Sequence, residues 1–156
     1  MNKIKLEIFA NEHWWGGSAA LGYTMPYDCN SNCTVDQINN TTNNQVSPLL
    51  MSDCGRFLYA PNGLAYIFKD GELTVSGEDM FYKTLDGGIK ACFEYLKTNI
   101  FPDDGEFPDE DLIIHPQYNT WIELTHYQCE EKIIEYAENL VKNGMPRGVI
   151  MIDATW

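Results

Sequence analysis

The order of apolar and polar residues in the first hundred positions predicts short β-strands. Residues 3–9 read Lys-Ile-Lys-Leu-Glu-Ile-Phe, and this alternation is typical of a strand with one buried face. Residues 64–69 and 72–76 are two further apolar-rich runs, separated by Asp70-Gly71, a dipeptide that favours a hairpin turn. Short strands with closely spaced turns predict a β-sandwich.

The same region contains segments with other patterns. Residues 49–51 and 56–60 are predicted to be strands joined by a turn, and residues 85–96 carry apolar side chains at helical spacing. The glycine-flanked residues 13–17 are predicted to form a loop. Residues 30–47 are dominated by Asn, Thr, Ser and Gln, so they are predicted to form a long surface loop.

The last forty residues show a different periodicity. Tyr118 to Leu124 is rich in β-forming residues, and Glu130 to Lys142 has an apolar stripe at helical spacing with Gly144 placed to end it. Residues 148–153 contain four consecutive apolar residues, as expected for a strand buried on both faces of a parallel sheet. Strand, helix and strand over about 35 residues predict a β-α-β unit.

These patterns divide the chain into three parts. We expect a β-sandwich domain at residues 1–98, an acidic, proline-containing linker at 99–117, and the first β-α-β of a (β/α)8 barrel at 118–156. A complete barrel needs roughly 200 residues or more. The chain has 156 residues, so the barrel is expected to be truncated.

Composition and charge exclude several classes of partner. Lys and Arg number 10 against 23 Asp and Glu, which gives a formal net charge of -13. Such a chain repels phosphate, so binding to nucleic acid or to an anionic membrane is not expected. No apolar run reaches the length of a membrane span and no secretory signal is visible, which predicts a cytoplasmic protein. The sequence does not specify an oligomeric state.

Cofactor and metal motifs were not found. The five cysteines are odd in number and scattered, which favours free thiols over a disulfide framework or a zinc site. The three histidines have no metal-binding spacing, and the chain has no Walker A loop or dinucleotide-binding glycine motif. We therefore expect no metal and no cofactor.

A small set of residues is placed to contact a ligand. Asp153 follows an apolar strand directly; its carboxylate either lies at the mouth of an α/β domain, where ligands bind, or caps a following helix. Trp121 and Trp156 lie in or near the same strands, where an aromatic ring either stacks on a sugar or belongs to the core. Trp14 and Trp15, in the glycine-flanked loop, are candidates for a site or a contact between domains.

Three stretches resemble glycoside hydrolase family 31. The strongest resemblance is at residues 116–123 (Pro-Gln-Tyr-Asn-Thr-Trp-Ile-Glu) and 143–156 (Asn-Gly-Met-Pro-Arg-Gly-Val-Ile-Met-Ile-Asp-Ala-Thr-Trp), which are similar to the first two barrel strands of that family. Residues 12–17 (Glu-His-Trp-Trp-Gly-Gly) are similar to the β-sandwich that precedes the barrel in bacterial members.

The resemblance implies the N-terminal part of a retaining α-glycosidase that hydrolyses O-glycosidic bonds in carbohydrate metabolism. In that family both catalytic carboxylates lie further along the barrel, so no residue here is expected to be catalytic. Asp153 matches the aspartate that contacts sugar hydroxyls, although the following Ala-Thr-Trp departs from the second acidic residue of many members. The alternative is a stand-alone β-sandwich module that binds a sugar or a protein.

Overall fold

The computed structural model describes residues 2–39 and 45–153. The chain forms two compact units, unit 1 at Met1–Asp103 and unit 2 at Asp104–Trp156. Each unit is described by itself.

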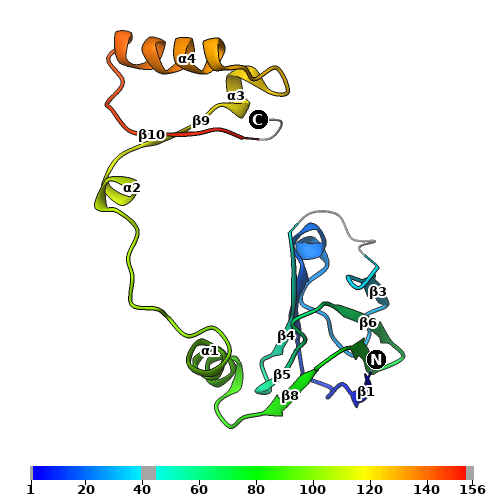
Figure 1. Cartoon of the computed structure of the whole chain (residues 1–156). Helices are drawn as coiled ribbons and strands as arrows, with labels where there is room; N and C mark the ends of the chain where they lie inside the picture. Colours follow the sequence, from blue (N-terminus) through cyan, green and yellow to red (C-terminus); the bar gives the residue numbers. More distant parts are fainter. Residues whose placement is uncertain (1, 40–44, 154–156) are drawn as a thin grey trace. The chain divides into compact units, whose positions relative to one another are not determined.

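In the described part of unit 1, eight strands form two antiparallel four-stranded sheets (Figure 1). The first sheet has the order β1-β7-β6-β3, with strands at Asn2–Glu7, Glu72–Gly77, Leu64–Lys69 and Cys33–Asp36 respectively. The second has the order β2-β4-β5-β8, with strands at Trp14–Ser18, Val46–Ser52, Arg56–Tyr59 and Phe81–Thr84. A 3-10 helix, η1 at Ala19–Thr24, follows β2.

Side chains from both sheets share one hydrophobic core. Tyr66 of β6 lies opposite Val75 of β7 in the first sheet, and Leu50 of β4 lies opposite Leu58 of β5 in the second. All four side chains are fully buried and belong to the same cluster. Alternate residues of a strand face opposite sides, and the inner strands β6 and β7 supply every second residue to this core. The prediction of a β-sandwich is confirmed.

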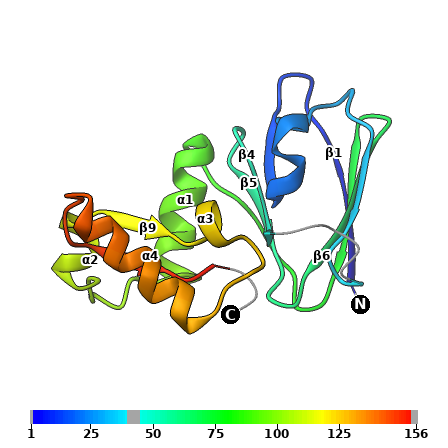
Figure 2. The same ribbon diagram turned by 90° about the horizontal axis from the view of Figure 1, so that it is seen from above.

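The outer face of the second sheet is covered by helix α1 at Gly88–Asn99 (Figure 2). Phe57, whose side chain points away from the main core, forms a second buried cluster with Cys92 and Leu96 of α1. The sequence placed this helix at residues 85–96, which is three residues too early. A Cβ atom on Gly88 would lie 2.8 Å from the Asp53 carbonyl oxygen, so the start of the helix is pressed against a turn of the sheet.

The prediction of a loop at residues 13–17 is wrong, because β2 begins at Trp14. Gly16 and Gly17, which suggested a loop, permit close packing instead. A Cβ atom on Gly16 would lie 2.1 Å from the Leu49 carbonyl oxygen, and one on Gly17 would lie 2.0 Å from the Tyr66 hydroxyl. The register of β2 against β4 also shifts between Gly16 and Ser18, as at a β-bulge.

The prediction of a continuous loop over residues 30–47 is also wrong within its described part. Strand β3 lies at Cys33–Asp36, and β4 already begins at Val46. Only Val35 of β3 is buried, where it faces Tyr66 of β6. A four-residue edge strand with one buried side chain leaves too little alternation for a pattern to reveal it. Residues 40–44 lie outside the described residues.

Unit 2 contains two strands and three helices among its described residues. Strand β9 (Gln117–Asn119) pairs in parallel with β10 (Val149–Met151), and Figure 1 shows α4 (Glu130–Lys142) running alongside the pair. The helix predicted at residues 130–142 is confirmed. The short helix α2 (Glu110–Ile114) is capped by Asp109, whose carboxylate accepts the Asp111 N–H. The helix lies within the segment predicted as a linker.

The strand predicted from Tyr118 to Leu124 is wrong in its second half. β9 ends at Asn119, and residues Trp121–Leu124 form the short helix α3. Asn119 Oδ1 accepts the Trp121 N–H over 2.7 Å, a local bond that turns the backbone out of the strand. The β-forming side chains of Trp121 and Ile122 suggested a longer strand, but this turn overrides their propensity.

Burial differs sharply between the units. Both hydrophobic clusters lie in unit 1, whereas Thr120 is the buried residue among the described residues of unit 2. Ile122 is 84% exposed, and Ile113 and Ile114 are 63% and 61% exposed. Of the two parallel strands, β10 carries half-buried Val149 and Ile150, and its Met151 is 47% exposed, so its apolar side chains are incompletely covered.

Candidate functional site

The carboxyl ends of β9 and β10 lie side by side because the strands are parallel, and polar side chains gather there. Asn119, the last residue of β9, donates from Nδ2 to Asp153 Oδ2 over 2.7 Å. Asp153 is half-buried and follows β10 by two residues. Since the Asn119 side-chain oxygen accepts the Trp121 N–H, both ends of this amide are engaged. The Asp153 carboxylate is thus held from the neighbouring strand.

Thr120 follows Asn119 directly and is fully buried. Its Oγ1 accepts the Asp153 N–H over 3.2 Å and lies 2.5 Å from Gln128 Oε1. Its own backbone N–H donates to the Met151 carbonyl oxygen over 3.1 Å. Thr120 therefore connects the end of β9, the end of β10 and the loop before α4.

Trp121 is the aromatic residue of this cluster. It is half-buried at the first position of α3 and meets the His126 ring edge-on, with 4.7 Å between the ring centroids. We call Asn119, Thr120, Trp121 and Asp153 the strand-end cluster. It combines a carboxylate and an amide, which hydrogen-bond to the hydroxyls of a sugar, with an aromatic side chain, which packs on the C–H face of a sugar ring.

A groove of about 760 Å³ lies in the same unit, between α3 with its following loop and one face of α4. Half-buried Leu124, Tyr136 and Leu140 line it together with exposed polar side chains such as Glu123 and Glu135. Neither Trp121 nor Asp153 lines this groove, so it is a separate feature from the strand-end cluster.

Two further predicted site residues, Trp14 and Trp15, lie in β2 of unit 1. Trp14 is fully buried in the core of unit 1, where it offers no exposed face to a ligand. Trp15 points to the other side of β2, is half-buried, and has its ring 6.2 Å from that of His13. Trp156 lies outside the described residues.

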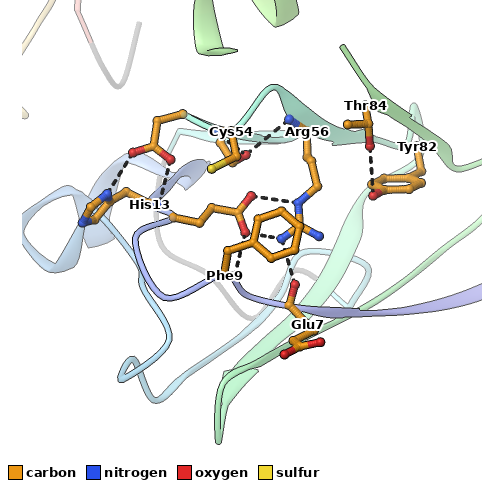
Figure 3. A network of polar contacts seen from close by, with 10 residues as sticks. Glu7, Phe9, His13, Cys54, Arg56, Tyr82 and Thr84 are labelled. Carbon is orange, nitrogen blue, oxygen red and sulfur yellow. Dashed lines mark hydrogen bonds and ion pairs between the residues drawn. The ribbon is translucent and has the colours of Figure 1, made fainter. Parts of the chain in front are cut away.

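The loop between β1 and β2 carries a buried ion pair that the sequence did not suggest (Figure 3). Glu12 is fully buried and Arg56 is 5% exposed. Arg56 Nε donates to Glu12 Oε1 over 2.8 Å, and Arg56 Nη2 donates both to Glu12 Oε2 and to the Glu7 carbonyl oxygen. The Phe9 ring covers the guanidinium, with its centroid 4.2 Å from Cζ. The pair ties the loop between β1 and β2 to β5, and the bond to the Glu7 carbonyl oxygen links Arg56 to the end of β1.

Hydrogen bonding sets the charge state of this pair. Burial alone would raise the pKa of Glu12, but hydrogen bonds from Arg56, Ser52 and the Phe9 N–H outweigh it and hold the pKa below its ordinary value. Burial would likewise lower the pKa of Arg56, but its bonds to Glu12 raise it. Both groups are therefore ionised, and we assign the pair a structural role.

His13 and Asp53 form a second, more exposed pair beside it. His13 Nδ1 lies 2.8 Å from Asp53 Oδ2, and the His13 backbone N–H donates to Asp53 Oδ1 over 2.9 Å. Burial opposes ionisation of Asp53, but these two bonds outweigh it and lower its pKa. The contact ties the loop before β2 to the turn after β4.

The sequence singled out Asp153 and Trp121 as candidate site residues but gave no sign of the residues that contact them. Asn119 could have been found, because the last residue of one parallel strand lies beside the residues that follow its partner. Thr120 and Gln128 gave no comparable signal, since buried hydrogen-bonding roles depend on where the chain turns. Glu12 and Arg56 are 44 residues apart, and no local pattern pairs them.

No protein-family model matches the chain, and no curated protein sequence matches it. Among residues 2–39 and 45–153, no three His, Cys, Asp or Glu side chains cluster closely enough to hold a metal ion. Within the same residues, no helix is long and apolar enough to cross a membrane.

Proposed function

We propose that the chain is the N-terminal part of a retaining α-glycosidase resembling family 31, and that the strand-end cluster binds the sugar. The observation that carries the proposal is the Asn119–Asp153 hydrogen bond at the carboxyl ends of two parallel strands. Ligands of α/β folds bind at this edge. A carboxylate held by an amide is oriented to accept hydroxyl protons, and Trp121 adds an aromatic surface beside it.

The incompletely buried apolar side chains of unit 2 support the proposal that this unit is part of a (β/α)8 barrel. On this two-stranded parallel sheet the apolar side chains of β10 are only half-buried, at Val149 and Ile150, or exposed, at Met151, whereas parallel sheets are found buried between layers. Further parallel strands beside β9 and β10 would cover these side chains. We therefore propose that the β9-α4-β10 segment is the start of a (β/α)8 barrel.

The proposal assigns substrate binding, not chemistry, to this chain. A retaining glycosidase needs two carboxyl groups about 5–5.5 Å apart. In the part of the chain that the structure describes, the strand-end cluster holds one carboxylate, that of Asp153. We expect the purified chain to release no p-nitrophenol from p-nitrophenyl α-glucoside, α-xyloside or α-galactoside. Turnover that copurifies with the chain would contradict this assignment.

Calorimetric titration with the methyl α-glycosides of glucose, xylose and galactose tests the binding site. A hydrogen bond to a charged group contributes about 1.5–3 kcal/mol, so Asp153→Asn should weaken binding of the preferred glycoside about ten-fold or more. Glu138→Gln, the same change of charge on the exposed face of α4, is the matched control and should leave binding unchanged. Equal affinities for Asp153→Asn and the parent chain would overturn the proposal.

A second candidate is a β-sandwich module that binds a sugar or a protein, and one feature of unit 1 favours it. Tyr59 stacks on Phe81 with 6.2 Å between ring centroids and meets Phe101 edge-on at 5.2 Å. Phe81 and Phe101 are each about half exposed, at 50% and 49%. An exposed aromatic group of this kind marks a binding surface. Under this candidate, Phe81→Ala lowers glycoside affinity and Asp153→Asn does not.

A further inference from the structure

We infer that Thr120 is the positioning residue of the strand-end cluster: its buried hydroxyl sets the place of Asp153, and Gln128 in turn holds that hydroxyl. The effect of Thr120 on sugar binding rests on the proposed function. The placement of Asp153 by Thr120 rests on hydrogen bonds within unit 2 alone. Thr120 is fully buried, and it is the buried polar residue at the point where β9, β10 and the loop before α4 meet.

The directions of the hydrogen bonds follow from the Gln128 amide. Gln128 Nε2 donates to the Thr125 carbonyl oxygen over 3.2 Å, so its Oε1 is the atom that faces Thr120. The Thr120 hydroxyl proton is directed to this oxygen, at 2.5 Å, in preference to the Met151 carbonyl oxygen at 3.3 Å. A lone pair of Oγ1 then accepts the Asp153 N–H.

This chain of bonds fixes the Asp153 backbone just beyond the last residue pair of the sheet. The ladder between β9 and β10 ends with Asn119 opposite Met151, followed by the bond from the Thr120 N–H to the Met151 oxygen. Beyond the end of β10, the Asp153 N–H donates to the Thr120 side chain and not to a backbone carbonyl oxygen of the neighbouring segment. Asp153 is thus held twice, at its N–H by Thr120 and at its carboxylate by Asn119.

Three substitutions separate positioning from general stability. Thr120→Val keeps the shape but removes the hydroxyl, and Thr120→Ser keeps the hydroxyl but removes the methyl group. Gln128→Met, at a half-buried position, removes the acceptor of the Thr120 hydroxyl proton and leaves the Thr120 side chain itself unchanged. The readout is the chemical shift and temperature coefficient of each backbone amide proton in the full chain, measured by NMR.

We expect Thr120→Val to move the Asp153 amide proton upfield and steepen its temperature coefficient, while the amide of residue 120, bonded to Met151, keeps its values. Thr120→Ser should restore the Asp153 signal, and Gln128→Met should shift it in the same direction by less. An unchanged Asp153 amide in Thr120→Val would overturn the inference. So would a change in all unit 2 amides together, in Thr120→Val or Gln128→Met, because that result indicates a general role in folding.

Affinity for the methyl α-glycosides supplies the functional arm. Thr120→Val should weaken binding about five-fold or more, as expected for loss of one positioning hydrogen bond, and Thr120→Ser should stay within about two-fold of the parent chain. If the parent chain binds no glycoside, the proposed function fails, and the amide signals still decide the role of Thr120. Loss of affinity in Thr120→Ser equal to that in Thr120→Val would contradict the inference.

Discussion

At the scale of single residues, Glu12 and Arg56 form a buried ion pair in unit 1. Both side chains are buried, and the pair ties the loop between β1 and β2 to the first residue of β5. Breaking a buried pair from one side leaves an uncompensated charge and costs about 3–5 kcal/mol. Glu12→Gln should therefore lower the free energy of unfolding of unit 1 by about that amount in urea denaturation.

The matched control for this substitution is Glu78→Gln, which makes the same change on an exposed side chain of unit 1. Its free energy of unfolding should stay within about 0.5 kcal/mol of the parent chain. Equal effects of the two substitutions would show that burial of the Glu12 charge has no consequence for stability.

The same pair predicts how stability depends on pH. The folded-state pKa of Glu12 is lowered from its ordinary value of 4.5. Its contribution is therefore fully present above pH 4.5 and is lost as pH falls through the lowered folded-state pKa. In thermal melts, the parent chain should lose stability more steeply below pH 4.5 than Glu12→Gln does. Parallel curves for the two chains would contradict the assignment.

At the scale of elements, helix α1 is held to the outer face of the second sheet by few side chains. Leu96 is 3% exposed and packs against Phe57, whereas Phe93 on the same helix is 58% exposed. Large-to-small substitution in a core costs about 2–5 kcal/mol. Leu96→Ala should destabilise unit 1 by that amount and Phe93→Ala by less than about 1 kcal/mol, as measured by urea denaturation.

The elements also show what the sequence could and could not predict. Strands whose apolar residues alternate with polar ones, such as β1 with Ile4 and Leu6, are visible because burial of one face imposes that period. β3 is hidden because Val35 alone is buried, and the end of β9 is hidden because the Asn119 side chain turns the backbone before Trp121. The apolar pattern of a sequence indicates which residues are buried. It does not indicate a boundary such as the end of β9, which depends on one side-chain hydrogen bond.

The strand-end cluster shows the same division. The position of Asp153 was predictable because an acidic residue directly after an apolar run indicates the end of a strand. Asn119 and Thr120 act through contacts with residues more than thirty positions away. Such contacts follow from the parallel register of β9 and β10, which sequence spacing does not specify.

At the scale of the whole molecule, the two units differ in how much apolar surface they bury. Unit 1 has two buried clusters, whereas the described apolar residues of unit 2 remain partly or largely exposed. Local stability follows buried contact. Hydrogen exchange should therefore protect the amides of β6 and β7 at least about a hundred-fold more than those of β9 and β10. Equal protection in a monomer would contradict the proposal that unit 2 needs further strands beside it.

The central claim is that the strand-end cluster binds a sugar, and chemical-shift mapping of the isotope-labelled chain during titration with a methyl α-glycoside tests it most directly. We predict that the perturbed amides gather at Asn119, Thr120, Trp121 and Asp153, and that Asp153→Asn reduces these changes at the same glycoside concentration. Perturbations gathered instead around Tyr59, Phe81 and Phe101, or none up to saturating glycoside, would contradict the claim.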